Sequence, residues 1–311
     1  DAARHLALEK PTELWTLGDF GYNDEQISEC ASNIAMTSPF RILSGEGVRV
    51  AKETALRLRN TAIQGRSDRV PTHVAGAVYK SRFLRDMCAC PQIQSFLCDL
   101  SGTKLAPHTL PSQQIYINYT PDDITKAVDA WHYDGIGFDY VLMVSDPKTL
   151  KGGYFEYFKG TKNIFAERFK RDVPTLRRGV SAELPSEDVV SVEFPAAGYG
   201  VFQQGNMIVH RAGRLLEYAE RITMIPGYVA LDVSYPDPTA MCDVPRYREP
   251  GICAEVARHS AWLAQRKLQS LMEDISLDET PVGVESLLTS AITDVQAALV
   301  SIRERIENGS L

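Results

Sequence analysis

Between residues 105 and 231 the chain is a series of short apolar runs separated by Gly, Pro and Asp, and this punctuation limits the folds that it can adopt. Short runs that alternate apolar and polar residues are typical of half-buried β-strands, and the breakers between them are typical of turns. Many such strands in succession favour a β-sandwich or a barrel. The runs that carry this prediction are residues 113–119, 132–144, 152–158, 189–194, 200–203, 207–211 and 221–231.

Helical patterns flank this β-rich segment on both sides. Asn23 or Asp24 precedes the first of them and fits a helix N-cap. In the others, apolar side chains recur at spacings of three and four, which is the pattern of an amphipathic helix. The predicted helices are residues 24–36, 46–63, 252–272 and 284–306.

These segments predict an α+β protein with a single domain over residues 1–311. Residues 1–104 are expected to be mostly helical support, 105–235 to form the β core, and 236–311 to form C-terminal helices. The apolar stripe of the last helix can pack on this β core or against another subunit. We expect it to pack on the core, with a homodimer through the C-terminal helices as the alternative.

The composition excludes several classes of protein. The 311 residues are 44% hydrophobic and carry a net charge of −7, which disfavours a nucleic-acid partner. No run of about eighteen apolar residues occurs, so we expect no membrane partner. The first residues lack the charged and apolar regions of a signal peptide, and six cysteines are too few for a disulfide framework. A cytoplasmic location is therefore expected.

Two histidines and one aspartate are the candidate metal ligands and catalytic residues. His132 and Asp134 are two positions apart, so on a strand end their side chains would point the same way. His210 ends a later strand pattern and is the candidate third ligand. Two neutral imidazoles and one carboxylate, with other coordination positions open, form the facial triad of non-haem Fe(II) oxygenases. Taken singly, either histidine is also compatible with an ordinary core or surface position.

An ordered set of residues around these ligands resembles the Fe(II)/2-oxoglutarate-dependent oxygenase family. The set is a strand ending in Asn118-Tyr119, then His132-x-Asp134, a Gly152-Gly153 strand, Gly198-x-Gly200-Val201-Phe202, His210, and Arg221-x-Thr223. The resemblance implies a double-stranded β-helix, or jelly-roll, core with flanking helices. It implies Fe(II), 2-oxoglutarate as co-substrate and O2, with oxidation of a C–H bond and succinate and CO2 as co-products.

The resemblance also implies a carboxylate clamp for 2-oxoglutarate. Arg221 lies eleven residues beyond His210, and Thr223 shares its strand face. Asn118 or Tyr116, from the strand before the metal ligands, are further candidates, but the sequence does not show which face of that strand points inward. A surface ion pair of Arg221 with Glu217 or Glu220 is the alternative, but its position at the start of a strand after His210 favours the clamp.

Four residues are candidates for substrate contact: Arg211, Arg214, Tyr154 and Glu156. The two arginines immediately follow His210 and suit the carboxylate of an amino acid. The other two belong to the Gly-Gly strand, where solvent exposure is the ordinary expectation for Glu156.

The predicted function is an Fe(II)/2-oxoglutarate-dependent dioxygenase acting on a small molecule, an amino acid or an amino-acid-derived natural product. Hydroxylation is the expected outcome, and desaturation or ring closure are related ones. One alternative is a peptidyl or protein hydroxylase of the same family, which would have a long open groove beside the metal. Another is a non-catalytic jelly-roll binding protein, which would hold no stoichiometric iron.

Overall fold

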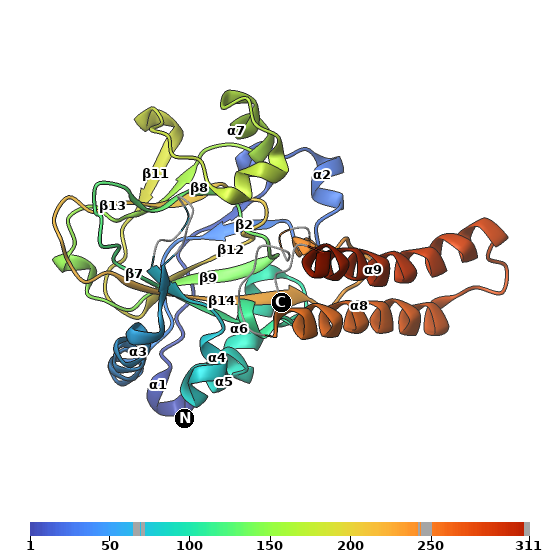
Figure 1. Cartoon of the computed structure of the whole chain (residues 1–311), viewed down its shortest axis with the longest axis horizontal. Helices are drawn as coiled ribbons and strands as arrows, with labels where there is room; N and C mark the ends of the chain where they lie inside the picture. Colours follow the sequence, from blue (N-terminus) through green and yellow to red (C-terminus); the bar gives the residue numbers. More distant parts are fainter. Residues whose placement is uncertain (65–68, 70–71, 242, 244–250, 308–311) are drawn as a thin grey trace.

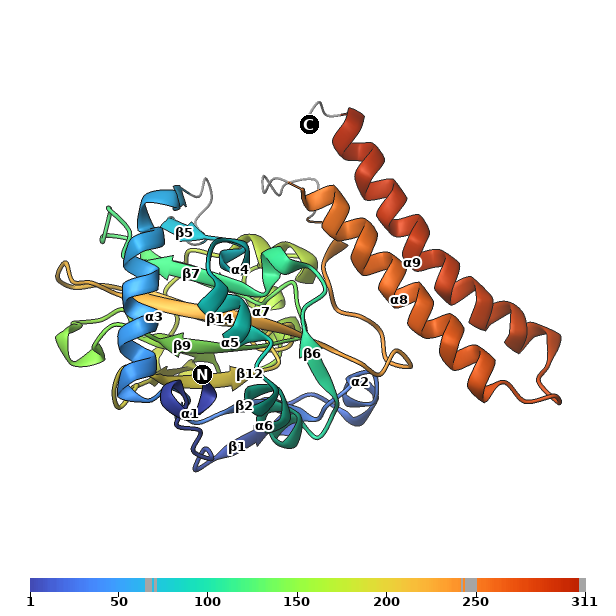
Figure 2. The ribbon, with the colours of Figure 1, turned by 90° about the horizontal axis from the view of Figure 1, so that it is seen from below.

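The computed structural model describes residues 1–64, 69, 72–241, 243 and 251–307. Two β-sheets form its centre, and the strand pairings among these residues are antiparallel. Helices cover the larger sheet on its outer side, and a long helical hairpin projects from one end (Figures 1 and 2). This mixture of helices and antiparallel sheets is the coarse architecture that the sequence predicts.

Eight successive strands build the facing parts of the two sheets. They are β7 (Ile115–Tyr119), β8 (Ala127–His132), β9 (Phe138–Met143), β10 (Phe155–Phe158), β11 (Val189–Val192), β12 (Tyr199–Gln203), β13 (His210–Arg214) and β14 (Ile222–Ala230). The larger sheet contains the order β12-β9-β14-β7, and the smaller sheet has the order β11-β10-β13-β8. The chain therefore passes from one sheet to the other at every step except β10 to β11.

The first 104 residues contribute strands as well as helices, so the expectation of mostly helical support is only partly right. β1 (Leu14–Thr16) and β2 (Ile34–Thr37) extend the larger sheet beyond β12, and β4 (Ile63–Gln64) and β5 (Thr72–Val74) extend it beyond β7. Two further short strands pair off this path. They are β3 (Phe40–Arg41), beside β12, and β6 (Leu105–Pro107), beside β14.

The predicted helix over residues 24–36 is wrong beyond its first turn. A capping box between Asn23 and Gln26 begins α2, as the N-cap pattern predicts, but α2 covers only Asp24–Ser28. Met36 instead pairs with Trp15 of β1 and Gln203 of β12. Pairing with strands distant in sequence therefore overrides the local helical spacing.

The outer face of the larger sheet packs against helices α3 (Gly45–Leu58), α5 (Arg82–Cys88) and α6 (Pro91–Ser101). Strand β7 shows how alternation divides the two faces. Ile117 and Tyr119 are fully buried in this layer, each contributing on the order of 2 kcal/mol. Tyr116 and Asn118 therefore point to the opposite side, between the two sheets. The remaining short helices of this part are α1 (Ala2–His5), α4 (Ala77–Lys80), η1 (Gly18–Phe20), η2 (Arg59–Thr61) and η3 (Pro111–Gln113).

The outer face of the smaller sheet packs against the segment between β10 and β11. Trp131 of β8 contacts Phe165 of α7 (Lys162–Arg168) and is fully buried, so it packs the sheet against this segment. The charged stretch at residues 162–186 therefore carries an apolar underside as well as exposed arginines. The other short helices here are η4 (Pro147–Thr149), η5 (Val173–Arg178) and η6 (Ser186–Asp188).

The two predicted C-terminal helices are confirmed as α8 (Ile252–Asp274) and α9 (Pro281–Glu307). Figure 2 shows them as an antiparallel hairpin whose tip lies far from the sheets. Leu110, Ile252, Val256 and Ala298 join its near end to the rest of the chain. Of the helices described, none has the length and apolar character needed to cross a bilayer. The cysteines of the described residues are free thiols, and Cys242 lies outside those residues.

Candidate metal centre

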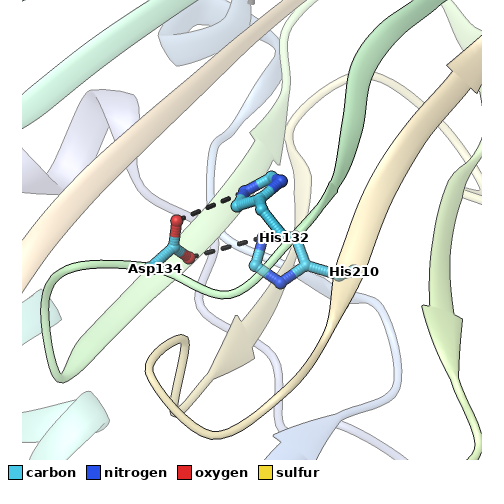
Figure 3. Close-up of side chains that lie close together, drawn as sticks. All are labelled: His132, Asp134 and His210. Atoms are coloured by element: carbon cyan, nitrogen blue, oxygen red, sulfur yellow. Dashed lines mark ion pairs between the residues drawn. The ribbon is translucent and has the colours of Figure 1, made fainter. Parts of the chain in front are cut away.

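The structure brings His132, Asp134 and His210 together between the two sheets (Figure 3). His132 ends β8 and is the register partner of His210, which begins β13. Asp134 follows in the loop after β8, with its carboxylate oxygens 3.4 Å from the Nε2 atoms of both histidines. One ligand atom from each of the three residues lies within 4.8 Å of the others. The predicted ligand set is therefore a compact cluster.

Backbone carbonyls fix the orientation of both imidazoles. His132 Nδ1 lies 2.7 Å from the carbonyl oxygen of Ala130, and His210 Nδ1 lies 3.0 Å from that of Ile208. A carbonyl only accepts, so each Nδ1 carries the proton in the neutral ring. Each Nε2 then has its lone pair directed toward Asp134, which is the tautomer that a metal requires.

Burial and charge keep the cluster in the ionisation state that suits a cation. Burial lowers the pKa of His210 to about 4, so this imidazole is neutral at physiological pH. Burial alone would favour the neutral form of Asp134, but His210, His132 and Arg69 together hold its pKa below the ordinary value. Two neutral nitrogens and one carboxylate match the mixed donor set that Fe(II) prefers.

Gly205 makes room for the Asp134 carboxylate. The Asp134 amide donates to the Gly205 carbonyl oxygen at 2.8 Å, which anchors the ligand loop. A Cβ atom at position 205 would lie 2.5 Å from Asp134 Oδ2 and 2.4 Å from Asp139 Oδ2. Contacts this short force one group to move, so the site requires glycine here.

Two polar residues beside the triad were missed by the sequence analysis. The Gln203 amide nitrogen lies 3.0 Å from Asp139 Oδ1 and 3.3 Å from Asp134 Oδ2. Asp139 is fully buried, and burial followed by the nearby Asp134 charge raises its pKa well above the usual value. Gln203 of β12 and Asp139 of β9 are register partners on the inward faces of their strands. In the sequence, only their positions within these strand patterns could have indicated them.

Arg221 is a buried cation, and no ion pair to it occurs among the described residues. Its side chain is 1% exposed, so the surface pairs with Glu217 or Glu220 do not form. Its Nε donates to the Gly153 carbonyl oxygen at 2.7 Å, and Nη1 lies 3.5 Å from Thr223 Oγ1. Burial lowers its pKa to about 10. A buried guanidinium without a carboxylate is costly unless an anion joins it.

The neighbouring strand places two more predicted residues on the inner side of the larger sheet. Asn118 of β7 is the register partner of Thr223 on β14, so their side chains are cross-strand neighbours. Asn118 Oδ1 is buried, and no described residue forms a hydrogen bond with it. Tyr116 shares the face of Asn118, but it stacks on His73 and accepts a hydrogen bond from Gln113. Asn118 is therefore the better placed of the two to bind a ligand.

The residues predicted to contact substrate do not gather at the triad. Arg211 pairs with Glu156 at 2.5 Å and lies over the Trp131 ring, on the outer face of the smaller sheet. Arg214 is exposed at the end of β13, and Tyr154 is 41% exposed. Alternation along β13 explains the position of Arg211, because a residue next to an inward His210 points outward.

Arg69 is the cation that lies beside the triad instead. Its Nε donates to Asp129 Oδ1 at 2.8 Å, and its Nη2 lies 3.9 Å from Asp134 Oδ1. Asp129 is also 3.6 Å from His132 Nδ1. No local motif marks Arg69, which reaches the site from a segment distant in sequence.

Comparisons with known proteins found no matching family model and no matching curated protein. Several solved structures are similar. SnoN, a non-heme alpha ketoglutarate dependent epimerase from nogalamycin biosynthesis, is 16% identical, with a TM-score of 0.45 over 68% of this chain and 82% of SnoN. SnoK, the carbocyclase from the same biosynthesis, is 17% identical, with a TM-score of 0.44 over 71% and 87%.

The third structure is HygX from Streptomyces hygroscopicus with nickel and 2-oxoglutarate bound. It is 15% identical, with a TM-score of 0.42 over 67% of this chain and 87% of HygX. SnoN has also been crystallised with Fe3+, alpha ketoglutarate and nogalamycin RO. SnoN, SnoK and HygX are thus solved structures that this chain is similar to, each at 17% identity or less.

Proposed function

We propose that this chain is an Fe(II)/2-oxoglutarate-dependent oxygenase with a single catalytic domain. The observation that carries the proposal is the His132–Asp134–His210 cluster together with Arg221, a buried cation lacking a carboxylate partner among the described residues. One site is suited to a divalent metal, and the other to an organic anion. The strand orders β12-β9-β14-β7 and β11-β10-β13-β8 support a double-stranded β-helix.

The chain's own residues have separate tasks in this proposal. His132 Nε2, His210 Nε2 and one Asp134 oxygen would hold Fe(II). Arg221 would bind the far carboxylate of 2-oxoglutarate through parallel hydrogen bonds, with Thr223 and Asn118 as further polar partners. When bound, the metal and 2-oxoglutarate supply the oxidising chemistry with O2, which attacks a C–H bond and yields succinate and CO2.

The larger sheet presents an apolar, water-excluding surface to the proposed site. Val141 and Met143 of β9 and Val201 of β12 are buried between the sheets. They exclude water from the space beside Asp139 and Gln203, where electrostatic interactions are consequently stronger. Gly153 leaves room for the Arg221 side chain, because a Cβ at position 153 would lie 3.1 Å from Arg221 Cδ.

We propose a small molecule as substrate, an amino acid or an amino-acid-derived natural product. Arg69, which is shared between Asp129 and Asp134, is the cation beside the position that a polar substrate group would take at the metal. Hydroxylation, desaturation and ring closure are all compatible outcomes of such a site. The free thiols of the described residues are typical of a reducing compartment, so we place the enzyme in the cytoplasm.

Anaerobic titration tests the proposal directly. Adding Fe(II) and then 2-oxoglutarate should produce the metal-to-ligand absorption band of the chelate, and the band should be lost in His132→Ala, Asp134→Ala and His210→Ala. A screen of small molecules for stimulated succinate release would then identify the substrate. A band that persists in all three variants would reject this metal site, and a chain that binds neither component would favour a non-catalytic protein.

A further inference from the structure

The large aliphatic side chains of α9 lie mainly on its exposed side. Where α9 faces α8 it buries small residues, Ala291 at 3% exposure and Ala298 at 4%. A polar bridge supplements this packing, with Lys267 Nζ 2.6 Å from Asp294 and 3.0 Å from Ser290. The pairing of the two helices thus leaves the bulkier apolar residues uncovered.

These uncovered residues form one regular seam. The seam consists of Leu288, Ile292, Val295, Leu299, Ile302 and Ile306. Its spacings alternate between four and three, which is the heptad pattern of a helix that pairs with another helix. Five of the six side chains are between 39% and 58% exposed, and Ile302 is partly buried at the near end of the hairpin. Contiguous exposed apolar residues on this scale mark an interaction surface.

We propose that the seam is a homodimer interface in which α9 pairs antiparallel with α9 of a second copy. A two-fold axis between the helices at residue 297 matches every seam residue with another seam residue. Leu288 then meets Ile306 of the partner subunit, Ile292 meets Ile302 of the partner subunit, and Val295 meets Leu299 of the partner subunit. Such self-complementarity is what an isologous interface requires.

The charge distribution of the hairpin selects the antiparallel direction. Residues 268–302 contain no Lys or Arg, but they contain Glu273, Asp274, Asp278, Glu279, Glu285 and Asp294. The near end carries Arg258, Arg303 and Arg305 together with Glu255, Glu304 and Glu307, so its charges balance. An antiparallel pair sets the acidic tip of each copy beside the charge-balanced near end of the other, so the two acidic tips are kept apart. A parallel pair would place the two acidic tips together, which is unfavourable.

The position of the hairpin makes the contact accessible. Figures 1 and 2 show its tip extending well away from both sheets, so a second hairpin can lie along it. The axis at residue 297 sets Glu285 within about one helical turn of Arg305 of the partner subunit. The sheets, and the metal ligands between them, lie outside this contact.

Sedimentation of the full chain tests the interface. We expect a dimer at about 10 µM, and Ile292→Lys with Leu299→Lys should weaken it by about 100-fold or more. The matched control is Thr293→Lys with Val300→Lys. It introduces the same two lysines one residue further along, outside the seam, and should remain dimeric. Far-UV circular dichroism spectra should coincide, since all four side chains are exposed in the single chain. A wild-type chain that is monomeric at about 100 µM would overturn the proposal and leave the seam to another protein.

Thiol cross-linking tests the direction. A mixture of Leu288→Cys and Ile306→Cys chains should form a disulfide between the two introduced thiols, identified by peptide mass spectrometry. Leu288→Cys alone should form none, because antiparallel pairing separates the two equivalent positions by about 27 Å. A disulfide between the two equivalent positions in Leu288→Cys would overturn the antiparallel arrangement.

Discussion

The imidazole rings of His132 and His210 stand 4.3 Å apart, centre to centre, on neighbouring strands β8 and β13. Seventy-eight positions separate them in the chain, so the smaller sheet itself creates their proximity. Two imidazole nitrogens this close, with one carboxylate facing both, make up a donor set that suits a cation.

Removing the Asp134 charge should abolish tight metal binding. Asp134→Asn keeps the side-chain shape but loses the anionic ligand, so the Kd for Fe(II) should rise by more than about 100-fold. Anaerobic titration calorimetry measures this change. Asp123→Asn is the matched control, because its carboxylate binds only Thr125 in its own turn. Equal Fe(II) affinity in wild type and Asp134→Asn would place the metal elsewhere.

Arg221→Met should weaken the binding of 2-oxoglutarate and at the same time stabilise the ligand-free protein against unfolding. The Kd for 2-oxoglutarate should rise by about 100-fold, because two charge-assisted hydrogen bonds are lost, while Fe(II) affinity stays the same. The free energy of unfolding of the ligand-free protein should rise by about 1 kcal/mol, since a buried unpaired charge is removed. Arg214→Met, at an exposed position, should change neither quantity. Unchanged 2-oxoglutarate affinity in Arg221→Met would contradict the clamp.

A methyl group at position 205 should disturb the ligand loop. Gly205→Ala places a Cβ against Asp134 and Asp139, so we expect Fe(II) affinity to fall by about 10-fold or more. Gly45→Ala is the control, because nothing lies within 4 Å of its added carbon. That variant should bind Fe(II) normally. If Gly205→Ala also did so, the Asp134 carboxylate would not be held as the structure shows.

His108 should make stability depend on pH. It accepts a hydrogen bond from the Leu110 amide and lies 3.2 Å from Thr239 Oγ1, and burial lowers its pKa to about 3. The unfolded chain takes up this proton near pH 6.5, so stability is lost as the pH falls below 6.5. The loss should be about 2 kcal/mol between pH 7 and pH 5.

Denaturant unfolding at the two pH values measures the contribution of His108. His108→Asn cannot be protonated but keeps an acceptor for the Leu110 amide, so its pH dependence should be smaller by that amount. Burial of His210 adds to the same slope in both proteins and cancels in the comparison. Identical slopes in the two proteins would mean that His108 is already protonated or solvated in the fold.

The metal ligands could be predicted from the sequence, although strand alternation was an incomplete reason for including Asp134. Side chains two apart converge on a strand, yet β8 ends at His132 and Asp134 lies beyond it. A loop hydrogen bond to Gly205, which alternation alone cannot reveal, turns Asp134 back toward the histidines. Arg221 was foreseen because its distance from His210 follows the resemblance, and the structure adds its burial.

Residues set by long-range packing could not be predicted. Ile27, Cys30, Ala31 and Ile34 have helical spacing, which predicted a helix as far as Met36, but pairing with distant strands decides the conformation of Met36. Arg69, Asp139 and Gln203 carry no local motif, and only the assembled sheets bring them to the site. Arg211 was assigned to the substrate by proximity in sequence, whereas adjacent strand positions face opposite ways.

Each imidazole takes its orientation from a carbonyl two residues earlier in its own chain segment. Main-chain atoms are common to every amino acid, so substitution of the surrounding side chains leaves these two anchors intact. As long as the backbone at residues 130–132 and 208–210 keeps its conformation, the Nε2 atom of each ring stays turned toward Asp134. The pocket walls can therefore be rebuilt for a new substrate without reconstructing the centre itself.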